Sequence, residues 1–64
     1  MADVEALKAE VRKLSAKAMQ AKMDLHDLSE ELPLGVETVI AVAERVRDAY
    51  AALAAKKAEL ETAS

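Results

Sequence analysis

The 64-residue sequence contains no cysteine, tryptophan or phenylalanine, and it has only one proline, one glycine and one tyrosine. The absence of cysteine excludes disulfides and any zinc site built on thiolates. No run of about 18 apolar residues is present, so the sequence predicts no transmembrane helix. The first eight residues lack the uninterrupted apolar stretch of a secretory signal, and we therefore expect a cytoplasmic protein.

What remains is the composition of long helices, with 53% hydrophobic residues, 15 alanines among them, and 33% charged residues. A chain this short rarely buries a core worth more than a few kcal/mol, and it cannot wall a large cleft. It also lacks a glycine-rich phosphate loop, and its serines have no conventional catalytic base arranged around them. We therefore expect a non-enzymatic protein without a cofactor, stabilised by self-association.

Pro33 and Gly35 divide the chain into two helical patterns. Proline disfavours helix at the residue before it, and glycine can adopt the positive φ of a tight connection. We predict one all-α domain with a helix over residues 3–32, a turn at 33–35 and a helix over 36–62. Apolar positions in both segments alternate by three and four residues, which is typical of a coiled-coil seam. The first seam comprises Val4, Leu7, Val11, Leu14, Ala18, Ala21, Leu25, Leu28 and Leu32. The second comprises Val36, Val39, Ala43, Val46, Tyr50, Leu53, Lys57 and Leu60.

The short connection favours an antiparallel hairpin in which the two seams face each other. In this register Tyr50, the largest seam residue, lies opposite Ala18, so that a large side chain meets a small one. One hairpin leaves half of each seam in contact with water, and Ile40 and Val42 widen the apolar face of the second helix. We therefore predict that hairpins pair into a four-helix bundle, as a homodimer or a higher oligomer.

A second apolar stripe lies off the seam of the first helix. Its members are spaced by three and four residues and share the face that points away from the hairpin partner: Ala16, Met19, Met23 and His26. A second packing face in an oligomer explains the stripe. The alternative is a surface for another protein, because methionine adapts to varied partners.

Charge is segregated along the first helix. Residues 8–22 contain five basic side chains and one acid, whereas residues 24–37 contain five acids and no lysine or arginine. Acids near the end of a helix lie where the helix dipole disfavours them, which makes this segment a candidate for function. Two interpretations explain this acidic segment. It is either a solvated end of the hairpin or a surface that contacts the basic half of another copy. The net charge of −3 disfavours nucleic acid as a partner.

The only histidine lies in the acidic segment. His26 and Glu30 are four residues apart, a spacing that presents two ligands for a divalent metal ion on one helix face. Asp27 and Glu31 form a parallel pair beside them. A second copy would have to complete such a site, and a structural or pH-responsive histidine is the alternative interpretation.

Residues 15–33, which read S-A-K-A-M-Q-A-K-M-D-L-H-D-L-S-E-E-L-P, resemble a known family. They are similar to the small Rop-like proteins encoded beside nitrogen-fixation genes in cyanobacteria and other diazotrophs, through A-K-M-D-L-H-D-L at 21–28, an acidic residue and then L-P. The resemblance extends over the whole chain, although the remainder is generic alanine-rich helix. It implies a self-associating helical hairpin with an accessory role in nitrogen fixation, in nitrogenase maturation, protection or electron supply.

The resemblance also implies where contacts are made. Five residues of this segment that lie off the predicted seam are the candidates for a surface that binds a nitrogen-fixation protein or another copy: Met19, Met23, Asp24, His26 and Asp27. Two other functions stay open. One is an RNA-binding bundle of the kind that the Rop protein represents, with the basic residues of 8–22 along an RNA helix pair. The other is a metal-handling protein that uses His26 and Glu30.

Overall fold

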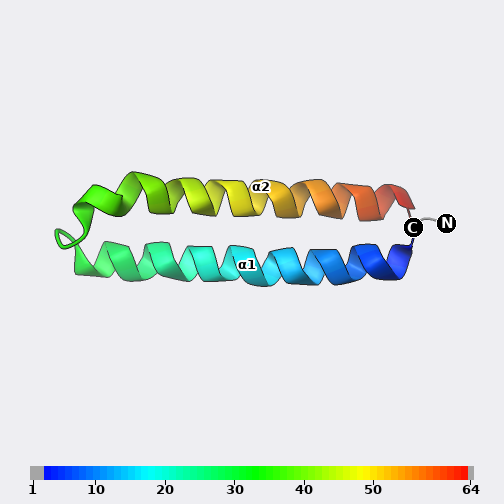
Figure 1. Cartoon of the computed structure of the whole chain (residues 1–64), viewed down its shortest axis with the longest axis horizontal. Helices are drawn as coiled ribbons and strands as arrows, with labels where there is room; N and C mark the ends of the chain where they lie inside the picture. Colours follow the sequence, from blue (N-terminus) through cyan, green and yellow to red (C-terminus); the bar gives the residue numbers. More distant parts are fainter. Residues whose placement is uncertain (1–2, 64) are drawn as a thin grey trace.

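The protein is a hairpin of two long helices, seen in a computed structural model that describes residues 3–63. Helix α1 (Val4–Glu31) is followed by a short 3-10 helix, η1 (Val36–Thr38), and by helix α2 (Val39–Ala63). The two long helices lie side by side and antiparallel, with the turn at one end of a rod that measures 50 × 14 × 12 Å (Figure 1). The predicted all-α hairpin is confirmed. No helix within residues 3–63 is long and apolar enough to cross a membrane.

The ends of α1 follow from the residues found there. Asp3 has an extended backbone, and its side chain accepts a hydrogen bond from the backbone N–H of Ala6 at 3.2 Å, which caps the first turn. The helix ends at Glu31 because Pro33 disfavours helical backbone at Leu32. Leu32, predicted as the last seam residue, is instead 42% exposed and lies outside the helix.

The turn depends on Gly35. This residue has φ of +77°, in the left-handed region that side chains disfavour. A Cβ atom there would also lie 3.0 Å from Cδ1 of Leu28. The chain then enters a 3-10 turn, in which the Thr38 hydroxyl donates a hydrogen bond to the Gly35 carbonyl at 2.7 Å. The predicted start of the second helix at residue 36 therefore corresponds to η1, and α2 begins at Val39.

The seam predicted for the first helix faces α2. Ala18 is almost fully buried, with 1% of its surface exposed. The other seam residues from Val4 to Leu28 are half-buried. Only Ala18, Val42 and Leu53 are buried among the described residues. A core of this size leaves much apolar surface in contact with solvent.

The predicted second seam is wrong at four alternate positions, the first of which, Val36, lies in η1 and is 58% exposed. Val42, Ala49 and Lys56 turn toward α1 in place of Ala43, Tyr50 and Lys57. Two overlapping series of apolar residues run along α2, and at Ala49 and Tyr50 size explains which residue faces α1. A tyrosine between two closely packed helices would force them apart, whereas alanine lets them approach. Tyr50 therefore lies at the edge of the interface, 39% exposed.

Lys56 enters this seam without burying its charge. Its side chain is 26% exposed, and its ammonium group lies 3.5 Å from a carboxylate oxygen of Glu59. The aliphatic stem thus covers apolar surface while the charged end reaches water and a partner. Lys57, the lysine that the sequence placed in the seam, is exposed outside it.

Candidate interaction surface and metal site

Three members of the predicted methionine stripe, Ala16, Met19 and Met23, line a shallow groove on α1, and the fourth, His26, is not among the lining residues. Met19 and Met23 are 54% and 46% exposed, although both are large apolar side chains. Their groove, called the methionine groove below, is lined by Arg12, Ser15, Ala16, Met19, Gln20 and Met23. All of these residues belong to α1, and the hairpin partner leaves the groove open. Exposed methionines with polar neighbours suit a surface that receives another molecule.

Of the five predicted surface residues, only Met19 and Met23 line the methionine groove, and Asp24 lies elsewhere. It is half-buried and lines a second groove, between α1 and α2, together with Arg45 and the small residues Ala21 and Ala49. Its carboxylate accepts a hydrogen bond from the side-chain amide of Gln20 at 2.9 Å. Asp24 therefore lies at the junction of the helices, and it contacts the methionine groove only through Gln20, which lines both grooves.

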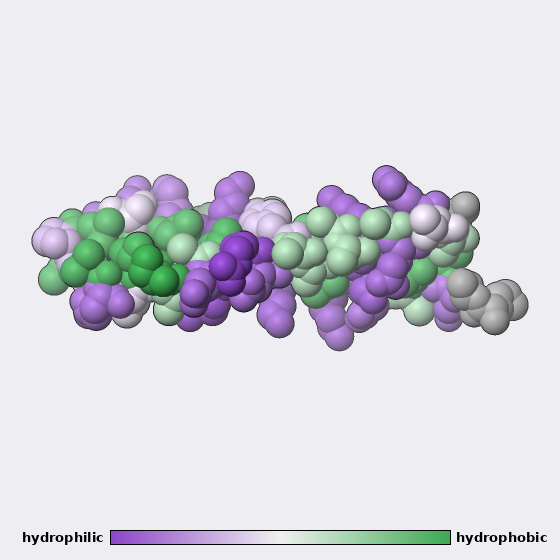
Figure 2. All heavy atoms as spheres, turned by 90° about the horizontal axis from the view of Figure 1, so that it is seen from above, coloured by the Kyte–Doolittle hydropathy of each residue, from purple (hydrophilic) through white to green (hydrophobic). Residues whose placement is uncertain are grey.

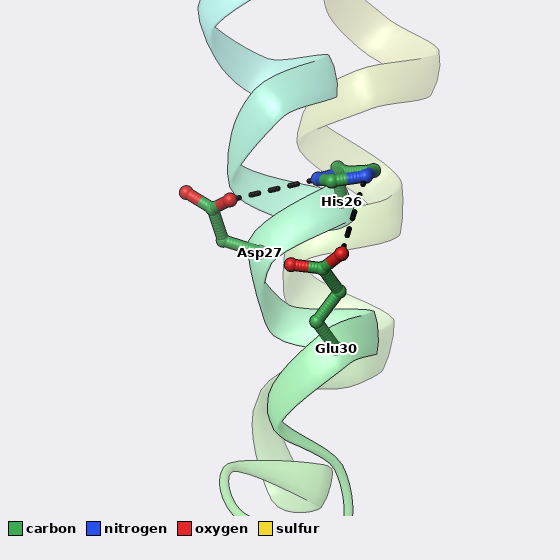
Figure 3. A group of neighbouring side chains, drawn as sticks. All are labelled: His26, Asp27 and Glu30. Atoms are coloured by element: carbon green, nitrogen blue, oxygen red, sulfur yellow. Dashed lines mark ion pairs between the residues drawn. The ribbon is translucent and has the colours of Figure 1, made fainter.

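His26, Asp27 and Glu30 form an exposed cluster near the end of α1 (Figure 3). Nδ1 of His26 lies 3.6 Å from a carboxylate oxygen of Asp27, and Nε2 lies 3.7 Å from one of Glu30. Glu30 is the residue that the spacing paired with His26. Asp27 joins it because its side chain turns back toward the ring, which the spacing of four residues does not indicate.

Two kinds of chemistry fit this cluster. A protonated imidazole would place one N–H toward each carboxylate and bridge them as an ion pair, near a helix end where positive charge is stabilising. A divalent cation would instead use one ring nitrogen and the two carboxylates. One ligand atom from each residue can be chosen so that all lie within 4.8 Å of one another. Ligands about 2.1 Å from one ion are separated by at most about 4.2 Å, so the three ligand atoms would have to move closer together to share one ion.

A third surface was not predicted. Four large apolar side chains at the turn end are exposed: Leu32, Leu34, Val36 and Ile40. Leu34 is 73% exposed and Ile40 is 70% exposed, the highest values among the large hydrophobic residues described. Figure 2 shows hydrophobic surface gathered at that end of the rod. The signal in the sequence was the apolar character of these residues in and next to the acidic segment. The sequence analysis, however, assigned Leu32 and Val36 to the seams and Ile40 to the apolar face of a bundle.

Charged side chains are exposed along both long helices. The basic residues of segment 8–22 are all exposed on α1. On α2, Arg47 Nε donates a hydrogen bond to Asp48 at 3.0 Å. This hydrogen bond and the adjacent negative charge raise the pKa of the Arg47 guanidinium. The pair is solvated and local, so it does not define a site by itself.

The fold and its surfaces define a small all-helical hairpin protein. The match to known families is specific, since a model of the Rop-like family covers residues 2–64. The chain therefore belongs to the Rop-like family, as the motif at residues 21–28 had indicated. No solved structure matches the chain in a search of known structures.

Several similar proteins carry the name UPF0437. A UPF0437 protein of Azorhizobium caulinodans is 49% identical over 53 residues, which cover 83% of this chain and 77% of the relative. The UPF0437 protein y4xE of Sinorhizobium fredii is 50% identical over 60 residues, covering 94% of this chain and 90% of the relative. A protein of Frankia alni, named as a UPF0437 protein in the nifX-nifW intergenic region, is 50% identical over 52 residues. The match covers 81% of this chain and 63% of the relative.

Proposed function

We propose that the protein is a non-enzymatic accessory factor of nitrogen fixation that acts by binding another protein through the methionine groove. The exposure of Met19 and Met23 carries this proposal, because both large apolar side chains are about half exposed and line a groove formed by α1 residues alone. The name of the Frankia relative, which places that protein between nif genes, supports the biological context. The partner belongs to nitrogenase maturation, protection or electron supply.

Self-association is part of the same proposal. Three buried residues within 3–63 make a small core for a helical hairpin. Apolar surface on both helices is left for a second copy, and association would bury it. We therefore propose a homodimer or a higher oligomer as the form that binds the partner. The expected cytoplasmic location stays a prediction.

Introducing a negative charge into the methionine groove tests the binding surface. Met19→Asp and Met23→Asp should leave the helical circular dichroism signal unchanged, because both side chains are exposed. Each should abolish capture of a nitrogen-fixation protein by the tagged chain from nitrogen-fixing cells, identified by mass spectrometry. Ala51→Asp is the control, since it places the same charge on an exposed position of α2. Equal recovery of the partner by all variants would refute this surface.

A second candidate function is divalent metal binding by His26, Asp27 and Glu30. The observation that favours it is the convergence of three ligand atoms within 4.8 Å on one helix. Three ligands from one chain leave positions on the ion for water or for a second copy. The exposed acidic surroundings would attract a cation, whereas exposed carboxylates alone bind divalent ions weakly.

Metal titration distinguishes a site from a solvated cluster. We expect calorimetry with Ni(II) or Zn(II) to give saturable binding that His26→Ala weakens by about tenfold or more, because the imidazole is the strongest ligand for these ions. Asp48→Ala is a control that removes an exposed carboxylate elsewhere. If wild type and His26→Ala bind with the same affinity, the cluster is no metal site.

A further inference from the structure

The groove between the two helices, here called the Asp24 groove, combines small apolar side chains with charged ones. Ala21 lines it from α1, and Ala49 and Ala52 line it from α2. Lys17 and Asp24 of α1 lie along its side. Because alanine side chains are short, a second molecule can approach the backbones of both helices closely at this groove.

The face of α1 beside the Asp24 groove carries charges in an order that complements itself when the helix is reversed. Residues spaced alternately by four and three positions form this face: Lys13, Lys17, Gln20, Asp24 and Asp27. Two bases precede the neutral Gln20, and two acids follow it at matching distances. A second copy of the same helix, in antiparallel orientation, therefore meets opposite charge at all four charged positions.

These four side chains are accessible to a second copy. Lys13, Lys17 and Asp27 are exposed, and Asp24 is half-buried. No ion pair within residues 3–63 involves Lys13, Lys17 or Asp24. Asp27 lies 3.6 Å from the exposed ring of His26. Opposite charges on another molecule can therefore contact this face without breaking ion pairs of the two lysines or of Asp24.

The opposite edge of the hairpin does not complement itself. Seven-residue spacing aligns three lysines along that edge, Lys8 and Lys22 on α1 and Lys57 on α2. The remaining positions of this edge on the two long helices are uncharged: Ser15, Ser29, Ala43 and Tyr50. Two copies that met through this edge would bring lysines together, and like charges that face each other across an interface are destabilising. The Asp24 groove is therefore the edge that matches a second copy.

We propose that two hairpins pair through their Asp24 grooves in antiparallel orientation, with a two-fold axis beside Gln20. Lys17 of each copy then faces Asp24 of the other, and Lys13 of each faces Asp27 of the other. This inference rests on the proposed function only in its self-association. It leaves the methionine groove, which shares Gln20 alone with the charged face, available to a different protein.

The size of this contact suits a specific dimer. Gln20 lies about three residues beyond the middle of α1, so the two rods are staggered by about 8 Å and overlap over about 40 Å. A face 14 Å wide with this overlap buries roughly 1,100 Å² over both copies, near the lower limit for specific interfaces. The complementary stretch ends at Glu10 and Glu31, which have the same sign and face each other. We therefore expect a dimer that is sensitive to single charge changes.

Cysteine cross-linking tests the position of the axis, because the chain has no cysteine. In Gln20→Cys, the two cysteines of a dimer lie beside the axis, close enough for a disulfide. Met19→Cys is the matched control, since Met19 is also exposed on α1 but lies in the methionine groove. Gln20→Cys should form disulfide-linked dimers at least about tenfold faster than Met19→Cys under the same oxidant. Equal rates, or faster cross-linking of Met19→Cys, would overturn the proposal.

Charge reversal measured by sedimentation equilibrium tests the paired side chains. Lys17→Glu and Asp24→Lys should each weaken dimerisation by about tenfold at low salt, because each creates two contacts between like charges. In a heterodimer of these two variants both contacts are again between opposite charges. An equimolar mixture should therefore recover at least half of the lost affinity in logarithmic terms. Lys22→Glu makes the same change on the opposite edge of α1 and should stay within about twofold of wild type. A mixture that associates no better than its components contradicts the pairing of Lys17 with Asp24.

These outcomes separate the two proposals. A chain that dimerises but is unaffected by these changes supports the proposed homodimer and rejects the Asp24 groove as its interface. A chain that stays monomeric refutes the homodimer and the groove together. Capture of a nitrogen-fixation protein, and its loss in Met19→Asp, is measured separately and tests the methionine groove in either case.

Discussion

Replacing Leu53 with alanine should lower the free energy of unfolding by about 2–4 kcal/mol, which is a large part of the total for a chain of this size. Leu53 is 7% exposed and is the largest of the three buried side chains. Removing the Leu53 side chain leaves a cavity between the two helices, and no third helix packs there to fill it. Thermal unfolding followed by circular dichroism should show a clearly lower midpoint, or a broad transition without a folded baseline.

Leu34→Ala is the matched control for Leu53→Ala, since it makes the same chemical change at a side chain that is 73% exposed. We expect a change within about 0.5 kcal/mol when unfolding is measured at low protein concentration. Repeating both scans at a higher concentration reveals any part of the stability that comes from self-association, because the midpoint of an oligomer rises with concentration. Equal loss in the two variants would mean that Leu53 is no core residue.

Most of the hairpin could be predicted from apolar spacing and punctuation. The first helix has one dominant series of large apolar residues, so its face toward the partner was unambiguous. The second helix has two series that interleave, and spacing alone cannot choose between Val42 and Ala43 or between Ala49 and Tyr50. The choice depends on how closely the backbones approach, which is a property of the assembled pair.

The candidate site was predicted in part for a related reason. Four-residue spacing brought His26 and Glu30 to one face, and their side chains do lie close together. Asp24 was grouped with Met23 because both lie off the predicted seam. A helix has two edges, however, and Asp24 lies on the one that lines the interhelical groove. The exposure of Leu34 and Ile40 depends on the path of the turn, which one proline and one glycine do not specify.

Small residues in this hairpin have different roles at neighbouring positions. Ala18 is almost fully buried, whereas Ala16, two residues earlier, lines the methionine groove. Ala49 lets α2 approach α1, and Tyr50 beside it stays at the edge. The alanine-rich composition thus does more than favour helix, because each buried alanine sets how close the two backbones can lie.

Ala18→Leu should therefore destabilise the hairpin, even though leucine is larger, more apolar and nearly as good a helix former. With 1% of its surface exposed, Ala18 has no space for three more carbon atoms. The helices must separate or adopt strained rotamers, at a cost of about 1–3 kcal/mol. Chemical denaturation should show a lower midpoint for unfolding than wild type.

Ala9→Leu is the control for this substitution, because Ala9 is an exposed residue of the same helix. Its unfolding free energy should stay within about 0.5 kcal/mol of wild type. The contrast between the two variants isolates packing from helix propensity, since both make the same change in α1. An Ala18→Leu protein as stable as Ala9→Leu would show that the helices can move apart freely at this layer. The close approach of α1 and α2 at Ala18 would then not be a determinant of the fold.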